Sequence, residues 1–396
     1  MNMQFADRVV NLEPAAVYEI LKHCGEGKAI AFAAGNPSPE TFPADEVAVL
    51  SQKILKENPI PALQYGPSEG YAPLRQAIVD ILAEKFNISS EGNGLVITSG
   101  ATQGIELCTK IFCNDGDTVI TENPTFIGSL NSFSSYRVNV VGVDMEFDGM
   151  DMNKLEEALK ASKNVRFIYV IPNFQNPTGW TMSLEKRKRL YELALKYNTL
   201  ILEDDPYGRL RYFGEYIPAI KSFDTENIVL YAGSFSKTIS PGLRVGFMHM
   251  PSAYAAKLAI AKQASDVHTP QLNQMIIYEF MKTHGLANHI AKVCDIYKNK
   301  LQLTFDLLEK HLGGKVTYVK PEGGLYVFCR LPDHIDMMEY CKNALTAGVA
   351  VVWGSSFQVD PGVKSNYFRI NFSSPTDEQL VKGIEILGRV FDEMNG

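Results

Sequence analysis

The chain has 396 residues, of which 45% are hydrophobic and 21% are charged. This length exceeds what one hydrophobic core usually serves, so we expect two globular domains. The formal net charge of -7 and the lack of an extended basic run argue against nucleic acid or an anionic membrane as the main partner. No apolar stretch reaches membrane-spanning length and the N-terminus shows no signal pattern, so we expect a soluble, cytoplasmic protein. The six cysteines are scattered and lack the spacing of a metal site.

Short apolar runs alternate with amphipathic helical patterns through the middle of the chain. We predict strands at 95–98, 118–120, 138–143, 165–171, 200–202, 228–232 and 244–248, and helices at 102–112, 151–161 and 184–197. This alternation is typical of an α/β fold with a mostly parallel sheet that helices cover on both faces.

The pattern changes after about residue 270, where we predict a smaller α+β domain. Its expected elements are helices at 288–311, 337–345 and 376–394 and strands at 315–318 and 324–328. The first 43 residues contain a Gly- and Pro-rich stretch that predicts an extended arm. We therefore assign 1–43 to an N-terminal helix and arm associated with the small domain, 44–275 to the large domain and 276–396 to the small domain.

Polar, turn-rich segments directly follow four of the predicted strands. They are 99–104, 173–179, 203–208 and 234–237. Open α/β sheets bind ligands outside the carboxyl ends of their strands. We therefore expect these four segments to meet at one edge of the large sheet and to form a shared site.

The segment Ser234-Phe235-Ser236-Lys237 carries the most chemistry, and Arg244 follows it closely. A lysine amine among phosphate-binding groups can hold an aldehyde cofactor as a Schiff base. A single lysine is more often a surface residue, so this segment alone leaves both interpretations open. The same residues match the Ser-x-x-Lys motif of serine acyl-enzymes, but the Ser-Asp-Asn and Lys-Thr-Gly elements that should accompany it are absent.

Two further segments suit the phosphate and the ring of such a cofactor. Ser99-Gly100-Ala101-Thr102 forms a glycine-containing turn from strand to helix, where backbone N–H groups can bind phosphate. An ordinary helix start capped by Ser99 or Thr102 explains the same residues. Phe126 follows the next strand and can cover one ring face, or it can belong to the core.

Three polar side chains suit the remaining demands of the chemistry. Asp204, at the end of an apolar run, can pair with a protonated pyridine nitrogen. Asn176 lies in a Pro-Gly turn and can bond a ring hydroxyl oxygen. Arg369 lies in an apolar strand pattern, where it can clamp a substrate carboxylate or be an edge-strand residue with a buried stem.

In combination these motifs make the chain resemble a known family. Asn176-Pro177-Thr178-Gly179, Asp204-Asp205-Pro206-Tyr207, the segment from Ser234 to Phe247 and the late strand with Arg369 resemble the fold-type-I aminotransferases, which use pyridoxal 5'-phosphate (PLP). The similarity is strongest to the 2-aminoadipate and kynurenine aminotransferase branch and runs over nearly the whole chain. It implies a large PLP-binding domain and transfer of an amino group from an L-amino acid to a 2-oxo acid, by default 2-oxoglutarate, in a ping-pong mechanism.

The resemblance also implies roles for residues around the cofactor ring. Lys237 carries the cofactor and moves the substrate's α-proton. Asp204 pairs with the pyridinium nitrogen, and Tyr207 and Asn176 bond the ring oxygen. Phe126 stacks on the ring.

Further implied roles concern the phosphate, the substrate and a second subunit. The phosphate ligands are Gly100, Ala101, Thr102, Ser234, Ser236 and Arg244. Arg369 clamps the substrate carboxylate beside Asn176, and Gly35 closes over the substrate. Tyr65 matches the residue that reaches the phosphate of the neighbouring subunit, so a homodimer with shared active sites is implied.

Two positions depart from the family pattern. Many relatives have a hydroxyl residue where this chain has Ala101, so this phosphate contact must come from the backbone. Tyr18 stands where aminoadipate-specific members carry an arginine for the distal carboxylate. We therefore expect Tyr18 to line the substrate site and an apolar or aromatic amino acid to be the substrate.

Two alternatives keep the fold and change the function. A PLP-dependent β-lyase would use the same cofactor for β-elimination, and the sequence separates it poorly from an aminotransferase. A non-enzymatic ligand-sensing domain, as in some transcription regulators, would follow a DNA-binding module. Only about 35 residues precede the Gly-Asn-Pro arm, which argues against such a module.

Overall fold

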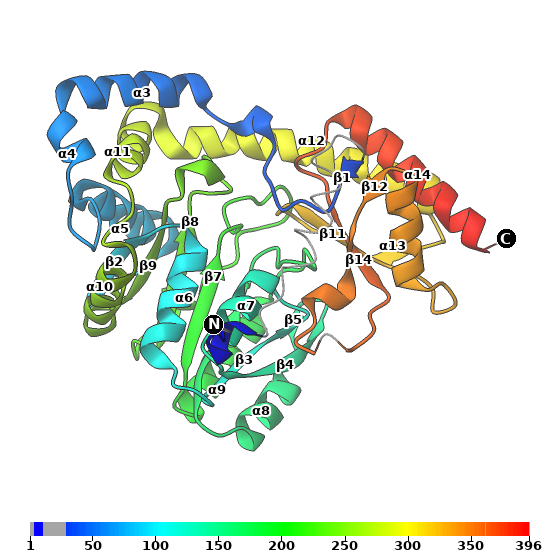
Figure 1. The fold of residues 1–396 in the computed structure, drawn as a ribbon, viewed down its shortest axis with the longest axis horizontal. Helices are drawn as coiled ribbons and strands as arrows, with labels where there is room; N and C mark the ends of the chain where they lie inside the picture. The colour runs from blue at the N-terminus through cyan, green and yellow to red at the C-terminus, as the bar shows by residue number, and fades with distance from the viewer. Residues whose placement is uncertain (1–3, 11–28, 361, 396) are drawn as a thin grey trace.

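The computed structural model describes residues 4–10, 29–360 and 362–395. Its described residues form a large mixed sheet, a smaller antiparallel sheet and the helices that cover them (Figure 1). Among the described helices, none combines the length and the apolar composition needed to cross a bilayer.

The large sheet has eight strands in the order β2-β9-β8-β7-β6-β3-β4-β5. Their bounds are β2 (Asn93–Thr98), β3 (Thr118–Asn123), β4 (Asn139–Glu146), β5 (Gly149–Met150), β6 (Val165–Val170), β7 (Leu200–Asp205), β8 (Val229–Ser234) and β9 (Gly246–Pro251). The pairs from β8 through β7, β6 and β3 to β4 are parallel, while β9 and β5 run antiparallel to their neighbours. The predicted mostly parallel sheet is therefore confirmed.

Helices cover both faces of this sheet. The residues of α6 (Ala101–Phe112), α7 (Ile127–Ser135) and α10 (Ser252–Asp266) pack on one face. The other face is covered by α5 (Ala72–Phe86), α8 (Met152–Ala161) and α9 (Leu184–Lys196). Successive strand residues alternate between the two cores: Leu202 packs with the first group and Ile201 with α8 and α9.

A helical layer lies beyond the β2 end of the sheet. It comprises α3 (Ala44–Glu57), α4 (Pro59–Leu63) and α11 (Gln271–Phe280), at the upper left of Figure 1. The π-helical turn η4 (Met281–Gly285) continues α11 into α12 (Leu286–Leu312), which runs across the top of the view to the small sheet. Shorter helical segments are α1 (Asp7–Val10), η1 (Pro39–Thr41), η2 (Ile220–Phe223), η3 (Pro241–Leu243) and η5 (Gly354–Phe357).

The small sheet has the order β10-β11-β14-β13. Its strands are β10 (Thr317–Tyr318), β11 (Tyr326–Arg330), β13 (Val352–Trp353) and β14 (Tyr367–Asn371), and its helices are α12, α13 (Met337–Thr346) and α14 (Asp377–Asn395). A separate parallel pair joins β1 (Ile30–Ala31) of the N-terminal arm to β12 (Val349–Ala350). The arm is therefore attached to the small sheet's side of the molecule.

Two details of the sequence interpretation change. The strand predicted at 244–248 begins only at Gly246 and continues to Pro251, because Arg244 adopts a left-handed conformation with φ 51° that ends η3. Arg369 is not on an edge strand, since β14 pairs with β11 on one side and β13 on the other. The α+β character of this region is confirmed, and the domain boundaries stay a prediction.

Candidate active site

A cavity of about 530 Å³ lies where the carboxyl ends of the large sheet's strands face the small sheet. It brings together residues from all four predicted loop segments and from β11 and β14. The predicted site residues that line it are Gly35, Ala101, Thr102, Phe126, Asn176, Asp204, Tyr207, Ser234, Ser236, Lys237, Arg244 and Arg369. Side chains far apart in the sequence therefore share one space.

The Lys237 amine lies inside this cavity, in the loop after β8. Its Nζ donates a 2.6 Å hydrogen bond to the carbonyl oxygen of Gly35 in the N-terminal arm. Removal from solvent lowers the pKa of this amine; Tyr326 opposes that effect, and the cations of Arg369 and Arg244 add to it. The lysine is therefore not the surface residue that its segment alone suggests.

Asp204 is buried at the end of β7 and lines the same cavity. The Tyr169 hydroxyl donates to its Oδ2 at 2.8 Å, and Ser129 Oγ donates to Tyr169 at 2.8 Å. Among the described residues, Oδ1 of Asp204 has no hydrogen-bond partner although it is buried. Burial raises the pKa of Asp204 to about 7, with the Tyr169 bond opposing this and the Asp205 charge adding to it. A cationic N–H placed in the cavity would satisfy this oxygen and favour its charged form.

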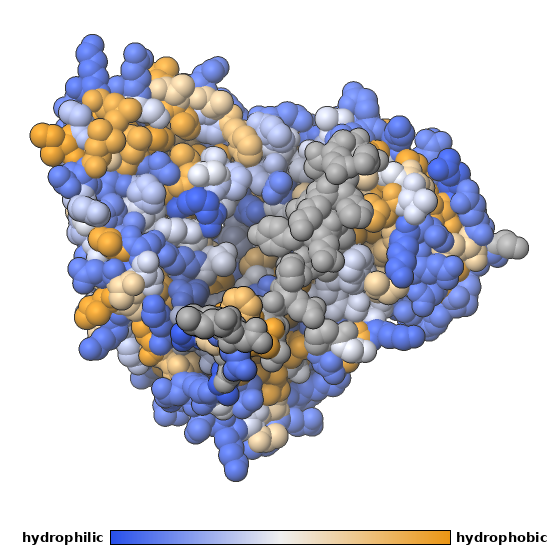
Figure 2. Space-filling view, viewed as in Figure 1, coloured by the Kyte–Doolittle hydropathy of each residue, from blue (hydrophilic) through white to orange (hydrophobic). Residues whose placement is uncertain are grey.

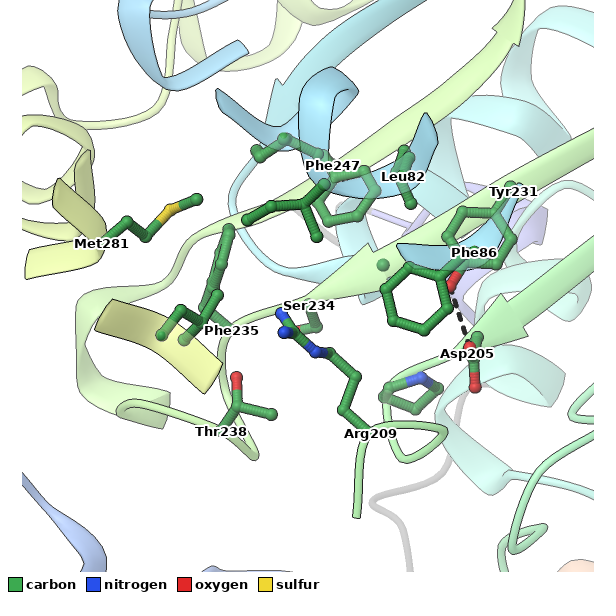
Figure 3. Close-up of a pocket in the computed structure, with 15 residues that line it drawn as sticks. Leu82, Phe86, Asp205, Arg209, Tyr231, Ser234, Phe235, Thr238, Phe247 and Met281 are labelled. Carbon is green, nitrogen blue, oxygen red and sulfur yellow. Dashed lines mark hydrogen bonds between the residues drawn. The ribbon is translucent and has the colours of Figure 1, made fainter. Parts of the chain in front are cut away.

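The neighbours of Asp204 point elsewhere because strand residues alternate between faces. Glu203 accepts the backbone N–H groups of Ile220 and Lys221, both at 2.8 Å, on the opposite face. Asp205 accepts a 2.8 Å hydrogen bond from Tyr231, drawn as a dashed line in Figure 3. Of the three consecutive acids, the alternation therefore leaves Asp204 as the one that lines the large cavity.

Figure 3 shows a second, much smaller cavity of about 40 Å³ on that opposite side. Phe86, Phe235 and Phe247 are among the residues that line it, and Arg209 is directed toward it. Ser234 and Pro206 line both cavities and separate them. This space has about the size of one or two water molecules, so we assign the chemistry to the larger cavity.

One end of the large cavity, around Gly100 and Arg244, is suited to bind a phosphate group. Gly100 begins α6 with φ 85°, and neither Ser99 nor Thr102 caps the helix through its side chain. Arg244 donates from Nη2 to the Ser99 carbonyl at 2.8 Å and from Nη1 to Ser236 Oγ at 3.4 Å. A helix N-terminus, two serine hydroxyls and a guanidinium therefore converge there, which is the donor set of an anion site.

The opposite end is formed by Arg369 and Asn176, both buried. Arg369 donates from Nη1 to Asn176 Oδ1 and from Nη2 to the Ala33 carbonyl, each at 2.7 Å. Its guanidinium lies 4.3 Å from the ring centre of Tyr326. Two of the five guanidinium N–H groups are used, so others remain for a carboxylate.

The structure also places residues that the sequence analysis missed. Tyr326 and Asn131 line the cavity, and Tyr169 supports Asp204 from behind. Tyr169 and Tyr326 occupy apolar strand patterns and therefore look like ordinary core residues. Nothing in the sequence signals their hydroxyl contacts, because these join strands that are distant in the chain.

Gly100, Tyr65 and Tyr18 are the remaining predicted site residues. Gly100 borders the cavity through Arg244, whereas Tyr65 is 79% exposed and lies outside the cavity wall of its own chain. Tyr18 lies outside the described residues. Within the described ranges, no cluster of three or more His, Cys, Asp or Glu side chains is arranged to hold a metal ion.

Comparison with known proteins agrees with this geometry. Residues 28–387 match the family model of class I and II aminotransferases. The chain is 36% identical over 393 residues to aromatic-amino-acid aminotransferase 1 of Thermococcus litoralis, covering 98% of this chain and 94% of the relative.

Two solved structures are also similar over nearly their whole length. The kynurenine aminotransferase of Pyrococcus horikoshii, in complex with PMP, is 35% identical with a TM-score of 0.94, covering 98% of this chain and 97% of that one. The α-aminoadipate aminotransferase LysN of Thermus thermophilus, complexed with N-(5'-phosphopyridoxyl)-L-leucine, is 33% identical with a TM-score of 0.90, covering 99% and 98%.

Proposed function

Because the chain belongs to the class I and II aminotransferases and is a PLP-dependent aminotransferase, we propose that it transfers the amino group of an apolar or aromatic L-amino acid to 2-oxoglutarate in a ping-pong mechanism. One observation carries this proposal. Lys237, Asp204 and Arg369 all line one cavity of about 530 Å³, and Oδ1 of Asp204 is buried with no hydrogen-bond partner among the described residues.

The donor and acceptor groups of the cavity suit PLP. Its phosphate would lie at the start of α6, with Ser234, Ser236 and Arg244 around it. Its protonated ring nitrogen would meet Asp204, and Phe126 would cover a ring face. When bound through Lys237, PLP supplies an electron sink for negative charge at the substrate's α-carbon.

The residues around the bound PLP would each have a separate role. The lowered pKa of Lys237 increases the uncharged fraction of its amine near neutral pH, which allows Nζ to take the α-proton and return it. Tyr169 holds the Asp204 carboxylate in place, and Asp204 keeps the ring nitrogen protonated. Tyr207 and Asn176 would bond the ring oxygen.

Arg369 would bind the substrate α-carboxylate through a pair of parallel hydrogen bonds. The cations that line the cavity in the described part of the chain are Lys237, Arg244 and Arg369. Lys237 and Arg244 are assigned to the cofactor and Arg369 to the substrate α-carboxylate. Among the described residues, the cavity therefore has no other cation to bind a second carboxylate on the substrate side chain. The cavity wall also contains the apolar and aromatic side chains of Ile105, Ile127 and Tyr326. These favour a substrate with an apolar or aromatic side chain.

We further propose that two copies of the chain share their active sites. Val49, Ile60 and Leu63 on α3 and α4 are 65%, 75% and 72% exposed, and Tyr65 follows them. Figure 2 shows hydrophobic surface gathered over α3 and α4 at the upper left. A second copy packed there would bury this surface and bring Tyr65 to the partner's phosphate.

For location we propose the cytoplasm, where free thiols such as the five described cysteines persist.

The substrate proposal is tested with purified holoenzyme and a panel of L-amino acids, followed by the visible absorption of bound PLP. We expect aromatic or branched apolar amino acids to convert the cofactor to its aminated form and 2-oxoglutarate to restore it. A preference for glutamate-like or aminoadipate-like donors would refute the side-chain preference. Release of ammonia with pyruvate would indicate the β-lyase instead.

The dimer is tested by light scattering and by mixed dimers. In the mixed dimer, a Tyr65→Phe chain is paired with a Lys237→Ala chain. If each subunit used its own Tyr65, each of the two active sites would carry one of the substitutions. Sharing predicts that this mixed dimer places both substitutions in one site and leaves the other intact, so it regains about half of the wild-type activity. Activity no higher than that of the Tyr65→Phe homodimer would contradict sharing.

A further inference from the structure

Tyr326 contacts two of the proposed site residues, Arg369 and Tyr207, and these contacts have no part in the roles proposed above. It begins β11, is 1% exposed and lines the cavity wall. Its ring lies beneath the Arg369 guanidinium, and its hydroxyl lies 3.4 Å from the hydroxyl of Tyr207. One side chain therefore contacts both the proposed carboxylate clamp and a proposed ligand of the PLP ring oxygen.

The direction of the hydrogen bond between the two phenols follows from proton counting. Tyr207 has one hydroxyl proton, and in its proposed role this proton is donated to the ring oxygen of PLP. The oxygen of Tyr207 is then free to accept. Tyr326 consequently donates to Tyr207, and the two hydroxyls form a short chain that ends at the cofactor.

We propose that Tyr326 is a positioning residue that acts through Tyr207 and Arg369. Its hydroxyl strengthens the hydrogen bond of Tyr207 to the ring oxygen, and its ring supports the guanidinium that binds the substrate carboxylate. This inference rests on the proposed roles of Tyr207, Lys237 and Arg369.

The hydroxyl chain has an electrostatic consequence. Donors that polarise one another stabilise negative charge on the acceptor, here the ring oxygen. With PLP bound through Lys237, the pH at which its visible absorption changes would then be lower. The titratable and charged groups that face the two phenols are Lys237, Arg369 and Asp204, with Arg244 also close to Lys237. Removing only the Tyr326 hydroxyl leaves all of these groups in place.

Tyr326→Phe isolates the hydroxyl, because the ring beneath Arg369 is kept. We expect the pH midpoint of the visible absorption change of the holoenzyme to rise by about 0.5 unit. The KM for the amino acid should change by less than about twofold, since the ring is retained. Tyr340→Phe is the matched control: it removes a buried hydroxyl that donates to the Leu387 carbonyl, away from the cavity, and should leave the midpoint unchanged.

Tyr207→Phe separates failure of this inference from failure of the proposed function. If Tyr207→Phe raises the midpoint and Tyr326→Phe does not, the hydroxyl chain is refuted while the role of Tyr207 stands. If neither variant moves it, the role of Tyr207 itself is wrong. A Tyr326→Phe variant that raises KM without moving the midpoint would show that the hydroxyl binds substrate, which also overturns the inference.

Tyr326→Leu tests the ring. Loss of the aromatic face beneath Arg369 should raise the KM for the amino acid roughly fivefold above that of Tyr326→Phe. The midpoint of the absorption change should equal that of Tyr326→Phe, because both variants lack the hydroxyl. Equal KM values for the two variants would contradict a supporting role of the ring.

Discussion

Nη1 of Arg369 donates a 2.7 Å hydrogen bond to Oδ1 of Asn176, across 193 positions of sequence. Arg369 belongs to β14 of the small sheet, and Asn176 follows β6 of the large sheet. Because a guanidinium can only donate, the atom of Asn176 that faces it must be the oxygen, and the amide nitrogen is left to donate. The proposed carboxylate clamp therefore fixes the orientation of the side-chain amide of a proposed cofactor ligand.

Arg369→Lys should reduce kcat/KM for amino acids by about 100-fold, because an ammonium cannot make the paired hydrogen bonds of a guanidinium to a carboxylate. The measurement is steady-state kinetics with the preferred amino acid. The matching amine, which lacks the carboxylate, is the control and should lose little of its already low rate. An equal loss with the amine would mean that Arg369 supports the fold and does not clamp the substrate.

Lys237→Ala should retain PLP but lose essentially all turnover. The anchoring phosphate site is untouched, whereas the group that moves the α-proton is gone. Cofactor content after gel filtration and single-turnover absorption changes with an amino acid measure the two properties separately. The variant loses the hydrogen bond to the Gly35 carbonyl but also the cost of burying the amine, so we expect only a small change in folding stability. A variant with measurable turnover would refute the assignment.

The sequence predicts some of the residues that line the cavity and misses others. The placement of Lys237, Asp204 and Arg369 in one cavity was predictable, because each carries a charge within or next to an apolar strand pattern. Alternation along β7 would also have separated Asp204 from Glu203 and Asp205. Tyr326 and Tyr169 were not predictable, since a tyrosine in a buried strand looks like core and its partners come from other strands. The left-handed turn at Arg244 was hidden by the apolar residues that follow it.

The buried carboxylate of Asp204 should make the cofactor-free protein less stable as pH rises. Burial raises its pKa from 3.8 to about 7, so between these values the folded chain holds a proton that the unfolded chain has lost. This contribution is fully present below about pH 4 and is lost as pH rises through about 7. Its size is on the order of a few kcal/mol.

Urea unfolding of cofactor-free wild type and Asp204→Asn between pH 4.5 and 8 measures this effect. The asparagine variant should show a shallower decline of the free energy of unfolding, because its side chain does not titrate. Glu203, whose pKa burial raises to about 7, contributes equally to both proteins. Burial raises the pKa of Glu122 to about 8 and the Asp204 charge adds to this, so the asparagine variant also loses part of the Glu122 contribution, which makes its decline shallower still. Identical pH dependence of the two proteins would show that Asp204 ionises normally in the folded chain.

Gly100→Ala should weaken PLP binding about tenfold or more, through Arg244. A Cβ on Gly100 would lie 2.2 Å from Nη2 of Arg244, so the guanidinium must leave its place between Ser99 and Ser236. Gly116→Ala is a matched control, since Gly116 has φ 81° but a Cβ there would meet nothing within 4 Å. Both variants should lose stability because a positive φ is strained for alanine, by about 1–3 kcal/mol each. Only Gly100→Ala should raise the dissociation constant of PLP, measured by fluorescence titration of the cofactor-free protein. Equal affinities would mean that the close contact at Gly100 does not position Arg244 for the phosphate.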